Sequence, residues 1–161
     1  MMVTNDRSGL ERLSTVEPGF PRVLSMADEP PATRIVLDVS EELSWFRGHF
    51  PGQPVLPGIV QLHWATLVSR HLYGFGNVPR EVKRLKFKNV VIPPRELQLT
   101  VTRKGEREVG FSFQSLGDVN SEGHIVFADE AYCGSVSSFR TTTMSSSSPR
   151  CSRSSSSRSC R

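Results

Sequence analysis

The sequence of 161 residues lacks the features that mark secreted, zinc-binding or membrane proteins. Its three cysteines, Cys133, Cys151 and Cys160, show no C-x-x-C spacing, which argues against a structural zinc site. No stretch approaches the ~20 apolar residues of a membrane span, and residues 1–13 lack the apolar core of a signal peptide. We therefore expect a protein of the reducing cytoplasm, without membrane insertion or a bound metal.

The formal net charge of +4 comes from the end of the chain. Residues 141–161 hold four arginines and no acid, and the rest of the sequence carries equal numbers of basic and acidic side chains. A nucleic-acid partner needs a basic face on the folded domain rather than a basic tail. The charge distribution therefore predicts no nucleic-acid partner.

The composition divides the chain into three parts. Residues 1–18 show no sustained apolar period and are expected to form a flexible leader, with a short helix near residues 10–13. Residues 140–161 are Ser, Thr and Arg with almost nothing apolar, so they predict a disordered tail. Residues 19–139 remain as one folded domain of ordinary size.

The middle part contains several strand-like runs and one long helix. The helix is expected from Pro57 or Gly58 to Leu72, with Gly74 and Gly76 ending it, and it is apolar on nearly every side. An antiparallel sheet of about five to six strands wrapped around one buried helix is an α+β arrangement. The predicted strands, separated by Gly- and Pro-containing turns, are residues 34–39, 82–91, 96–103, 108–116 and 123–133.

The segment WFRGHFPGQPVLPG, residues 45–58, places glycines and three prolines around His49, directly before the helix. The prolines fix backbone dihedral angles, and Gly58 allows close approach of a substrate to the backbone. Free amides in a first helical turn stabilise negative charge. The Gly58 amide is therefore a candidate donor to an oxyanion on a thioester carbonyl, with His49 beside it as a general base.

This segment resembles the signature of the 3-hydroxyacyl-[acyl-carrier-protein] dehydratases of the hotdog superfamily, the FabA and FabZ group. Residues 84–97 resemble the family's next strand and turn, and the string VLPGIVQLHWA, residues 55–65, is more similar to the ApeI-type branch, which is associated with aryl polyene pathways. The resemblance implies a hotdog fold, a homodimer with sites across its interface, and a substrate carried by an acyl carrier protein. It implies no cofactor.

The resemblance also implies residue roles. His49 takes the alpha proton, and the Gly58 amide binds the thioester carbonyl. The family's carboxylate, which assists departure of the 3-hydroxyl, falls on His63, so this chain departs from the pattern there. The product would be a trans-2-enoyl thioester of fatty acid or aryl polyene type. The expected substrate-binding residues, which would line a narrow apolar tunnel, are Phe50, Val55, Leu56, Pro57, Gln61 and Trp64.

Several alternatives stay open at this point. His63 is either a second catalytic histidine or a hydrogen-bonded core residue, and Gln61 faces the substrate, the solvent or a neighbouring subunit. A hotdog thioesterase and a catalytically silent hotdog subunit are the rival functions. The thioesterase usually needs a carboxylate near the helix start, and none lies between Gly48 and Leu72. Four basic side chains either lie on a solvated strand face or contact the carrier protein. They are Arg47, Arg84, Lys86 and Lys88.

Overall fold

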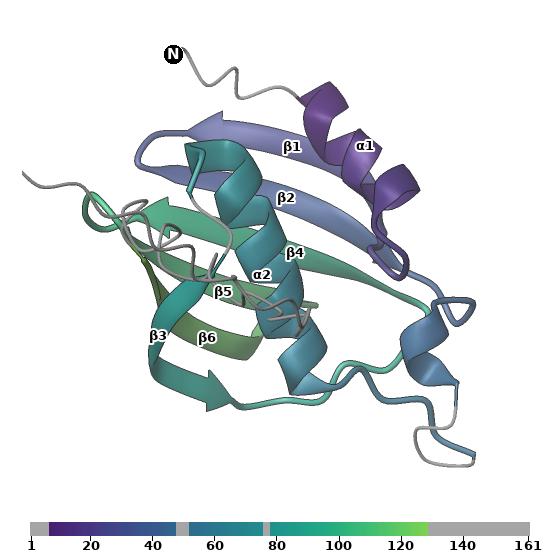
Figure 1. Cartoon of the computed structure of the whole chain (residues 1–161). Coiled ribbons are helices and arrows are strands. Elements are labelled where there is room, and N and C mark those ends of the chain that lie inside the picture. Colours follow the sequence, from purple (N-terminus) through teal and green to yellow (C-terminus); the bar gives the residue numbers. More distant parts are fainter. Residues whose placement is uncertain (1–6, 48–51, 76–77, 129–161) are drawn as a thin grey trace, which may run out of the picture.

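The computed structural model describes residues 7–47, 52–75 and 78–128. Within these ranges two α-helices, one 3₁₀ helix and six strands form a single layered unit (Figure 1). The helices are α1 (Arg7–Val16), η1 (Ser44–Phe46) and α2 (Gly58–Tyr73). The strands are β1 (Arg22–Glu29), β2 (Ala32–Val39), β3 (Pro79–Phe87), β4 (Arg95–Arg103), β5 (Glu108–Ser115) and β6 (Asp118–Phe127).

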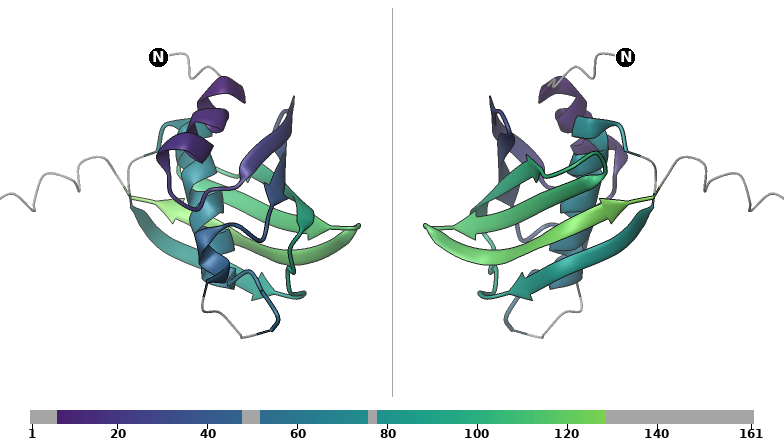
Figure 2. Two further views of the ribbon diagram at one scale, coloured as in Figure 1. Left: turned by 90° about the vertical axis from the view of Figure 1, so that its right-hand side faces the viewer. Right: turned by 90° about the vertical axis from the view of Figure 1, so that its left-hand side faces the viewer.

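The six strands form one antiparallel sheet in the order β1-β2-β4-β5-β6-β3. Strands β4, β5 and β6 are consecutive, whereas β3 crosses over to the far edge and pairs with β6. The sheet curves around α2, which lies against its concave face (Figures 1 and 2). This architecture confirms the expected α+β arrangement of a sheet around one long helix.

Alternation along the strands builds the core. In β4, for example, Leu97, Leu99 and Val101 are fully buried, and the residues between them face outward. Burying each such side chain contributes roughly 1.5–3 kcal/mol. The helix supplies the other side of the core through residues that include Trp64 and Val68, both fully buried. The inner face of the sheet and α2 therefore share one hydrophobic core.

The limits of α2 follow from local chemistry. Pro57 adopts an extended conformation as the N-cap, so the helix starts at Gly58 rather than at Pro57. Gly74 ends it in the left-handed conformation, with φ of 66°, and its amide donates to the Arg70 carbonyl. Most of the helix is buried, but Ile59 and His63, one turn apart, are exposed. The expectation of burial on all sides is wrong for this strip.

Other boundaries differ from the sequence-based expectations. Strand β3 ends at Phe87 rather than at residue 91, because the chain then turns toward α2. Strand β6 begins at Asp118, and β1 was not predicted. Residues 7–16, expected within a flexible leader, form α1, whose Leu10 is fully buried. Residues 129–161, which include Cys133 and the expected tail, lie outside the described residues. No helix in the described ranges has the length and apolar character needed to cross a membrane.

Candidate active site

The start of α2 is held close to the end of β3. The Leu56 amide donates to the Val91 carbonyl at 2.8 Å, which ties the segment before the helix to the loop after β3. Intrahelical bonding begins with the Val60 amide, which donates to the Pro57 carbonyl at 3.1 Å. The amides of Gly58 and Ile59 precede this bond, so the helix presents its first donors here, where its dipole favours negative charge.

Gly58 lies directly under an aromatic ring. A Cβ atom added at this position would overlap the ring of Phe87, the last residue of β3. Phe87 is 52% exposed, so its ring covers Gly58 from the solvent side. Only glycine permits this approach. An incoming carbonyl would therefore have to displace the Phe87 ring to reach the Gly58 amide.

Gln61, one turn along α2, is fixed by the sheet. The Ser121 hydroxyl of β6 donates to the Gln61 side-chain oxygen at 2.6 Å, and both residues are buried. The bond sets which way the amide group points, because its oxygen must face Ser121. The alternative in which Gln61 faces the solvent is therefore wrong.

His63 lies on the exposed side of α2 and contacts Trp45. The two rings meet edge to face, with centroids 6.3 Å apart. The Trp45 indole N–H donates to the Gly19 carbonyl at 2.8 Å, and Gly19, with φ of +85°, leaves no room for a Cβ atom beside the indole. His63 is therefore an exposed residue held against an anchored ring, and the alternative of a buried core histidine is wrong.

The remaining predicted site residues fall into two groups. His49 and Phe50 lie in residues 48–51, outside the described residues, so the position of the expected general base is not described. Trp64 is fully buried and packs edge to face against Phe20, with centroids 6.3 Å apart. Leu56 is also buried, whereas Val55 and Pro57 are half-buried at the helix entrance. The structure brings Pro57, Gly58 and Gln61 together at one end of the helix.

Sequence reasoning assigned no role in the site to two residues that the structure brings to it. Phe87 and Ser121 are ordinary strand residues, and only the pairing of β3 with β6, in which they face each other, brings both to the start of α2. Among the described residues, no group of three or more His, Cys, Asp or Glu side chains is placed to hold a metal ion. The described site therefore consists of backbone amides, an amide side chain, an imidazole and aromatic rings.

The comparisons with known proteins agree with this geometry. The sequence profile of a family described as "ApeI-like: ApeI dehydratase" matches residues 25–124, which include Gly58, Gln61 and His63. The chain belongs to the ApeI-like dehydratase family. A chain of the ApeI:P dehydratase heterocomplex from Xenorhabdus doucetiae is 26% identical, with a TM-score of 0.62 over 68% of this chain and 98% of that one. The fold of this family member is the hotdog fold.

Curated relatives carry the name 3-hydroxyacyl-[acyl-carrier-protein] dehydratase FabZ. The protein of that name from Legionella pneumophila (strain Lens) is 30% identical over 82 residues, which are 45% of this chain and 55% of the relative. The chain therefore spans about half the length of that relative. The protein of the same name from Anaeromyxobacter sp. (strain K) is 26% identical over 133 residues, 75% of this chain and 84% of the relative. These relatives support the hydro-lyase class for the ApeI-like chain.

Proposed function

We propose that this chain is a 3-hydroxyacyl-[acyl-carrier-protein] dehydratase that removes water from a 3-hydroxyacyl thioester of the fatty acid or aryl polyene type. The observation that carries the proposal is Gly58, the first residue of α2, whose amide precedes the intrahelical bonds and which has no side chain of its own beside that amide, where the Phe87 ring packs. The family membership and the dehydratase names of the relatives support it.

In the proposed reaction, His49 removes the alpha proton and the resulting negative charge moves to the thioester oxygen. The Gly58 amide donates to that oxygen, and its contribution is greatest when the charge is formed. The C3–oxygen bond then breaks, and His63 supplies the proton that turns the departing hydroxyl into water. The acyl group rests on side chains at the helix entrance and core, namely Phe50, Val55, Leu56, Pro57, Gln61 and Trp64.

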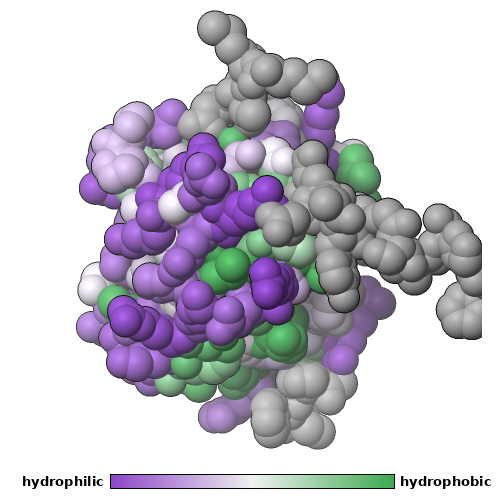
Figure 3. Space-filling model, turned by 60° about the vertical axis from the view of Figure 1, so that its left-hand side comes forward, coloured by the Kyte–Doolittle hydropathy of each residue, from purple (hydrophilic) through white to green (hydrophobic). Residues whose placement is uncertain are grey.

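We also propose that the active form is a homodimer joined at the β3 edge of the sheet. In the described sheet β3 pairs with β6 on one side only, and large apolar side chains are exposed nearby. Figure 3 brings this side forward and shows hydrophobic surface among hydrophilic residues. A monomeric chain exposes few contiguous patches of this kind. The residues of the patch are Ile59, Leu85, Phe87, Val90 and Ile92. A cytoplasmic location is part of the same proposal, because the proposed substrate is bound to an acyl carrier protein.

Purified chain incubated with a 3-hydroxyacyl carrier protein and followed by mass spectrometry tests the reaction. Loss of one water supports the dehydratase, release of the free acid supports the rival thioesterase, and an unchanged substrate supports the silent subunit. His49→Ala should abolish the loss of water, and turnover that survives this substitution contradicts the proposed base. His124→Gln is the matched control, because this histidine lies on the outer face of the sheet.

Sedimentation measurements test the dimer. Ile59→Glu should weaken association at least about tenfold, because a charge in the centre of an interface is unfavourable. The fold should tolerate it, since an acidic residue suits the first turn of a helix. Leu116→Glu alters an apolar residue that is 86% exposed on the β5–β6 turn and serves as the control. Equal association of both variants would remove the patch from the interface.

A further inference from the structure

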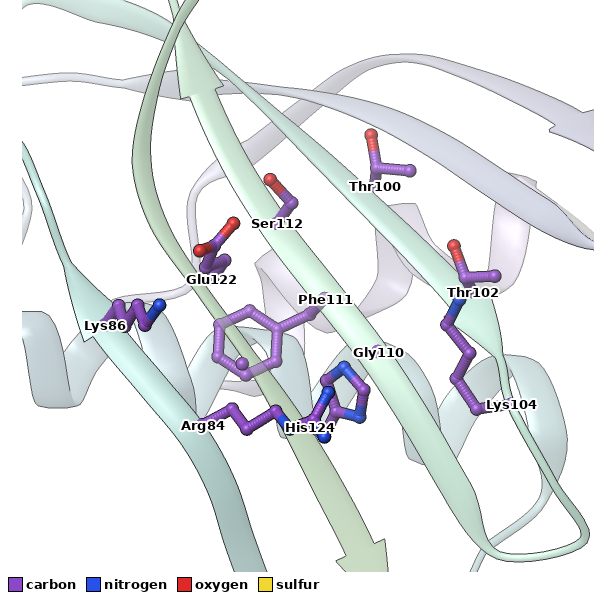
Figure 4. Close-up of a pocket in the computed structure, with 11 residues that line it drawn as sticks. Arg84, Lys86, Thr100, Thr102, Lys104, Gly110, Phe111, Ser112, Glu122 and His124 are labelled. Carbon is purple, nitrogen blue, oxygen red and sulfur yellow. The ribbon is translucent and has the colours of Figure 1, made fainter.

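The outer face of the sheet carries a hollow of about 380 Å³ that the proposed reaction does not use. It spans β3, β4, β5 and β6, and Figure 4 looks onto it with the helix behind the strands. Thr100 and Thr102 of β4 line it, and they alternate with the buried core residues Leu99 and Val101. Because successive side chains of a strand point to opposite faces, the hollow lies on the face opposite α2.

The hollow exists because small residues occupy this part of the sheet. Gly110 of β5 lies between Thr102 and His124 in the register, so the middle of that row has no side chain. The neighbouring row has the short side chain of Ser112 beside Thr100. Short hydroxyl side chains therefore border the hollow and offer hydrogen bonds to a ligand, and the Lys104 side chain passes over Gly110.

Arg84 reaches the hollow through an irregular backbone. The pairing of β3 with β6 shifts register between Lys83 and Lys86, and Arg84 in this bulge has φ of 52°. A non-glycine residue with positive φ costs of order 1–3 kcal/mol and persists only where the surrounding structure holds it. Bulges often redirect a side chain. Here the Arg84 side chain extends over the sheet toward His124 (Figure 4).

Positive charge collects around the hollow. Arg84, Lys86 and Lys104 line it, and in the described part of the chain none of the three has a carboxylate within ion-pair distance.

The two nearby carboxylates already have partners. Glu122 contacts the Lys88 ammonium at 2.9 Å, and Glu108 contacts the His124 imidazole at 2.8 Å. The hydrogen bond with Lys88 is the largest cause that lowers the pKa of Glu122, which favours the ionised form of this carboxyl group. Glu122 itself lines the hollow, and Lys86 and Arg84 also act on the charges of Glu122 and Glu108, so the three cations leave the lining of the hollow with a net positive charge.

We infer that this hollow binds the phosphate group of a small phosphorylated ligand, at a second site on the face opposite the thioester site. The planar fork of an arginine and the ammonium of a lysine are the side chains that bind phosphate oxygens most strongly. Thr100, Thr102 and Ser112 add hydroxyl donors. The volume matches the lower range of small-molecule sites, which begins at about 300 Å³. Free phosphate and a nucleotide such as the adenosine bisphosphate part of coenzyme A share this chemistry.

Amide NMR titrations of the full chain with inorganic phosphate, pyrophosphate and 3′,5′-ADP test the site. Saturable shifts are expected at Thr102, Gly110 and His124, with little change at Gly58. Tighter binding of 3′,5′-ADP than of the inorganic anions would identify a nucleotide as the source, and equal binding would identify a free phosphate. No saturable binding of any of the three probes overturns the inference.

Matched variants separate this site from general charge attraction. Arg84→Gln should weaken binding about tenfold or more, because a charged hydrogen bond is lost. Arg80→Gln removes an exposed arginine of the same strand that does not line the hollow, and it should leave binding unchanged. Arg84→Gly removes the charge and suits the positive φ, so the chain should unfold at the same temperature or higher while binding is lost. Equal weakening by the Arg80 and Arg84 variants, or full binding by Arg84→Gly, contradicts the site.

Discussion

The indole of Trp45 and the imidazole of His63 meet edge to face, with ring planes inclined by 64°. The indole N–H is anchored on the Gly19 carbonyl, so the ring position is set independently of His63. The first residue of the segment 45–58 therefore also contacts the proposed proton donor.

Trp45→Leu should lower stability by about 1–2 kcal/mol, because it removes one hydrogen bond and one aromatic pair. The NMR signal of the His63 ring should shift, since the neighbouring aromatic ring is lost. Trp45→Phe keeps a ring near His63 without the N–H, so it should retain most of the dehydratase activity that the leucine variant loses. Equal activity of the two variants would show that the ring does not position His63.

Gly58→Ala should leave the chain folded and reduce dehydration about 100-fold, because the backbone N–H remains but the methyl group keeps the carbonyl from reaching it, which equals the loss of one oxyanion donor. The new methyl group would push the exposed Phe87 ring aside and occupy the space beside the amide. Gly58→Ala combined with Phe87→Ala removes the overlap between methyl and ring. If activity returns in the double variant, Gly58 matters only for packing against Phe87, and its proposed contact with the carbonyl is wrong.

The buried pair Ser121 and Gln61 should behave as a coupled unit in urea unfolding. Ser121→Ala leaves the Gln61 oxygen without its donor and should cost about 1–3 kcal/mol. Gln61→Leu leaves the serine hydroxyl unsatisfied at a similar cost. The double variant should be less destabilised than the sum of the two, because neither unpaired group remains. Strictly additive effects would mean that the bond contributes no stability.

The pair Glu108 and His124 should make stability depend on pH in the acid range. Its hydrogen bond with His124 holds the pKa of Glu108 below the ordinary value of 4.5. The ionised carboxylate therefore stabilises the fold above pH 4.5, and this stabilisation is lost as the pH falls through the lower folded-state pKa. The difference in unfolding free energy between the natural chain and Glu108→Gln should shrink from pH 6 to pH 3. Glu106→Gln, on the adjacent turn, provides the comparison, and a difference that stays constant over this range excludes the linkage.

The features that could be predicted are those that depend on residues close to one another in the sequence. Pro57 and Gly74 limit the helix through their own backbone preferences, and the alternation of Leu97, Leu99 and Val101 defines a half-buried strand. Strand β1 was missed because only Val23 is buried among its eight residues, so its sequence carries little alternation. The helix α1 was underestimated for a similar reason, since its buried contact rests mainly on Leu10.

The site was predicted only in part. The role of Gly58 followed from its position before an apolar helix, and the structure places it there. The contacts of Phe87 with Gly58 and of Ser121 with Gln61 join segments far apart in the chain, and they depend on the curvature of the sheet. The exposure of His63 likewise depends on which side of α2 the sheet leaves uncovered. The apolar residues of the helix are spread around nearly all of its sides, so the sequence of α2 does not indicate that side.

The crossover of β3 to the edge beside β6 has a consequence for how the molecule is assembled during synthesis. In the described sheet, β3 is bonded through β6 alone, and β6 is the last of the described strands to be made. Hairpin β1–β2 and strands β4 and β5 can associate while the ribosome is still adding the rest of the domain. Phe87 pairs with Ser121, so β3 can join the sheet only after β6 has been made. We therefore expect a nascent chain to complete the sheet edge beside its candidate active site later than the β1–β2 hairpin.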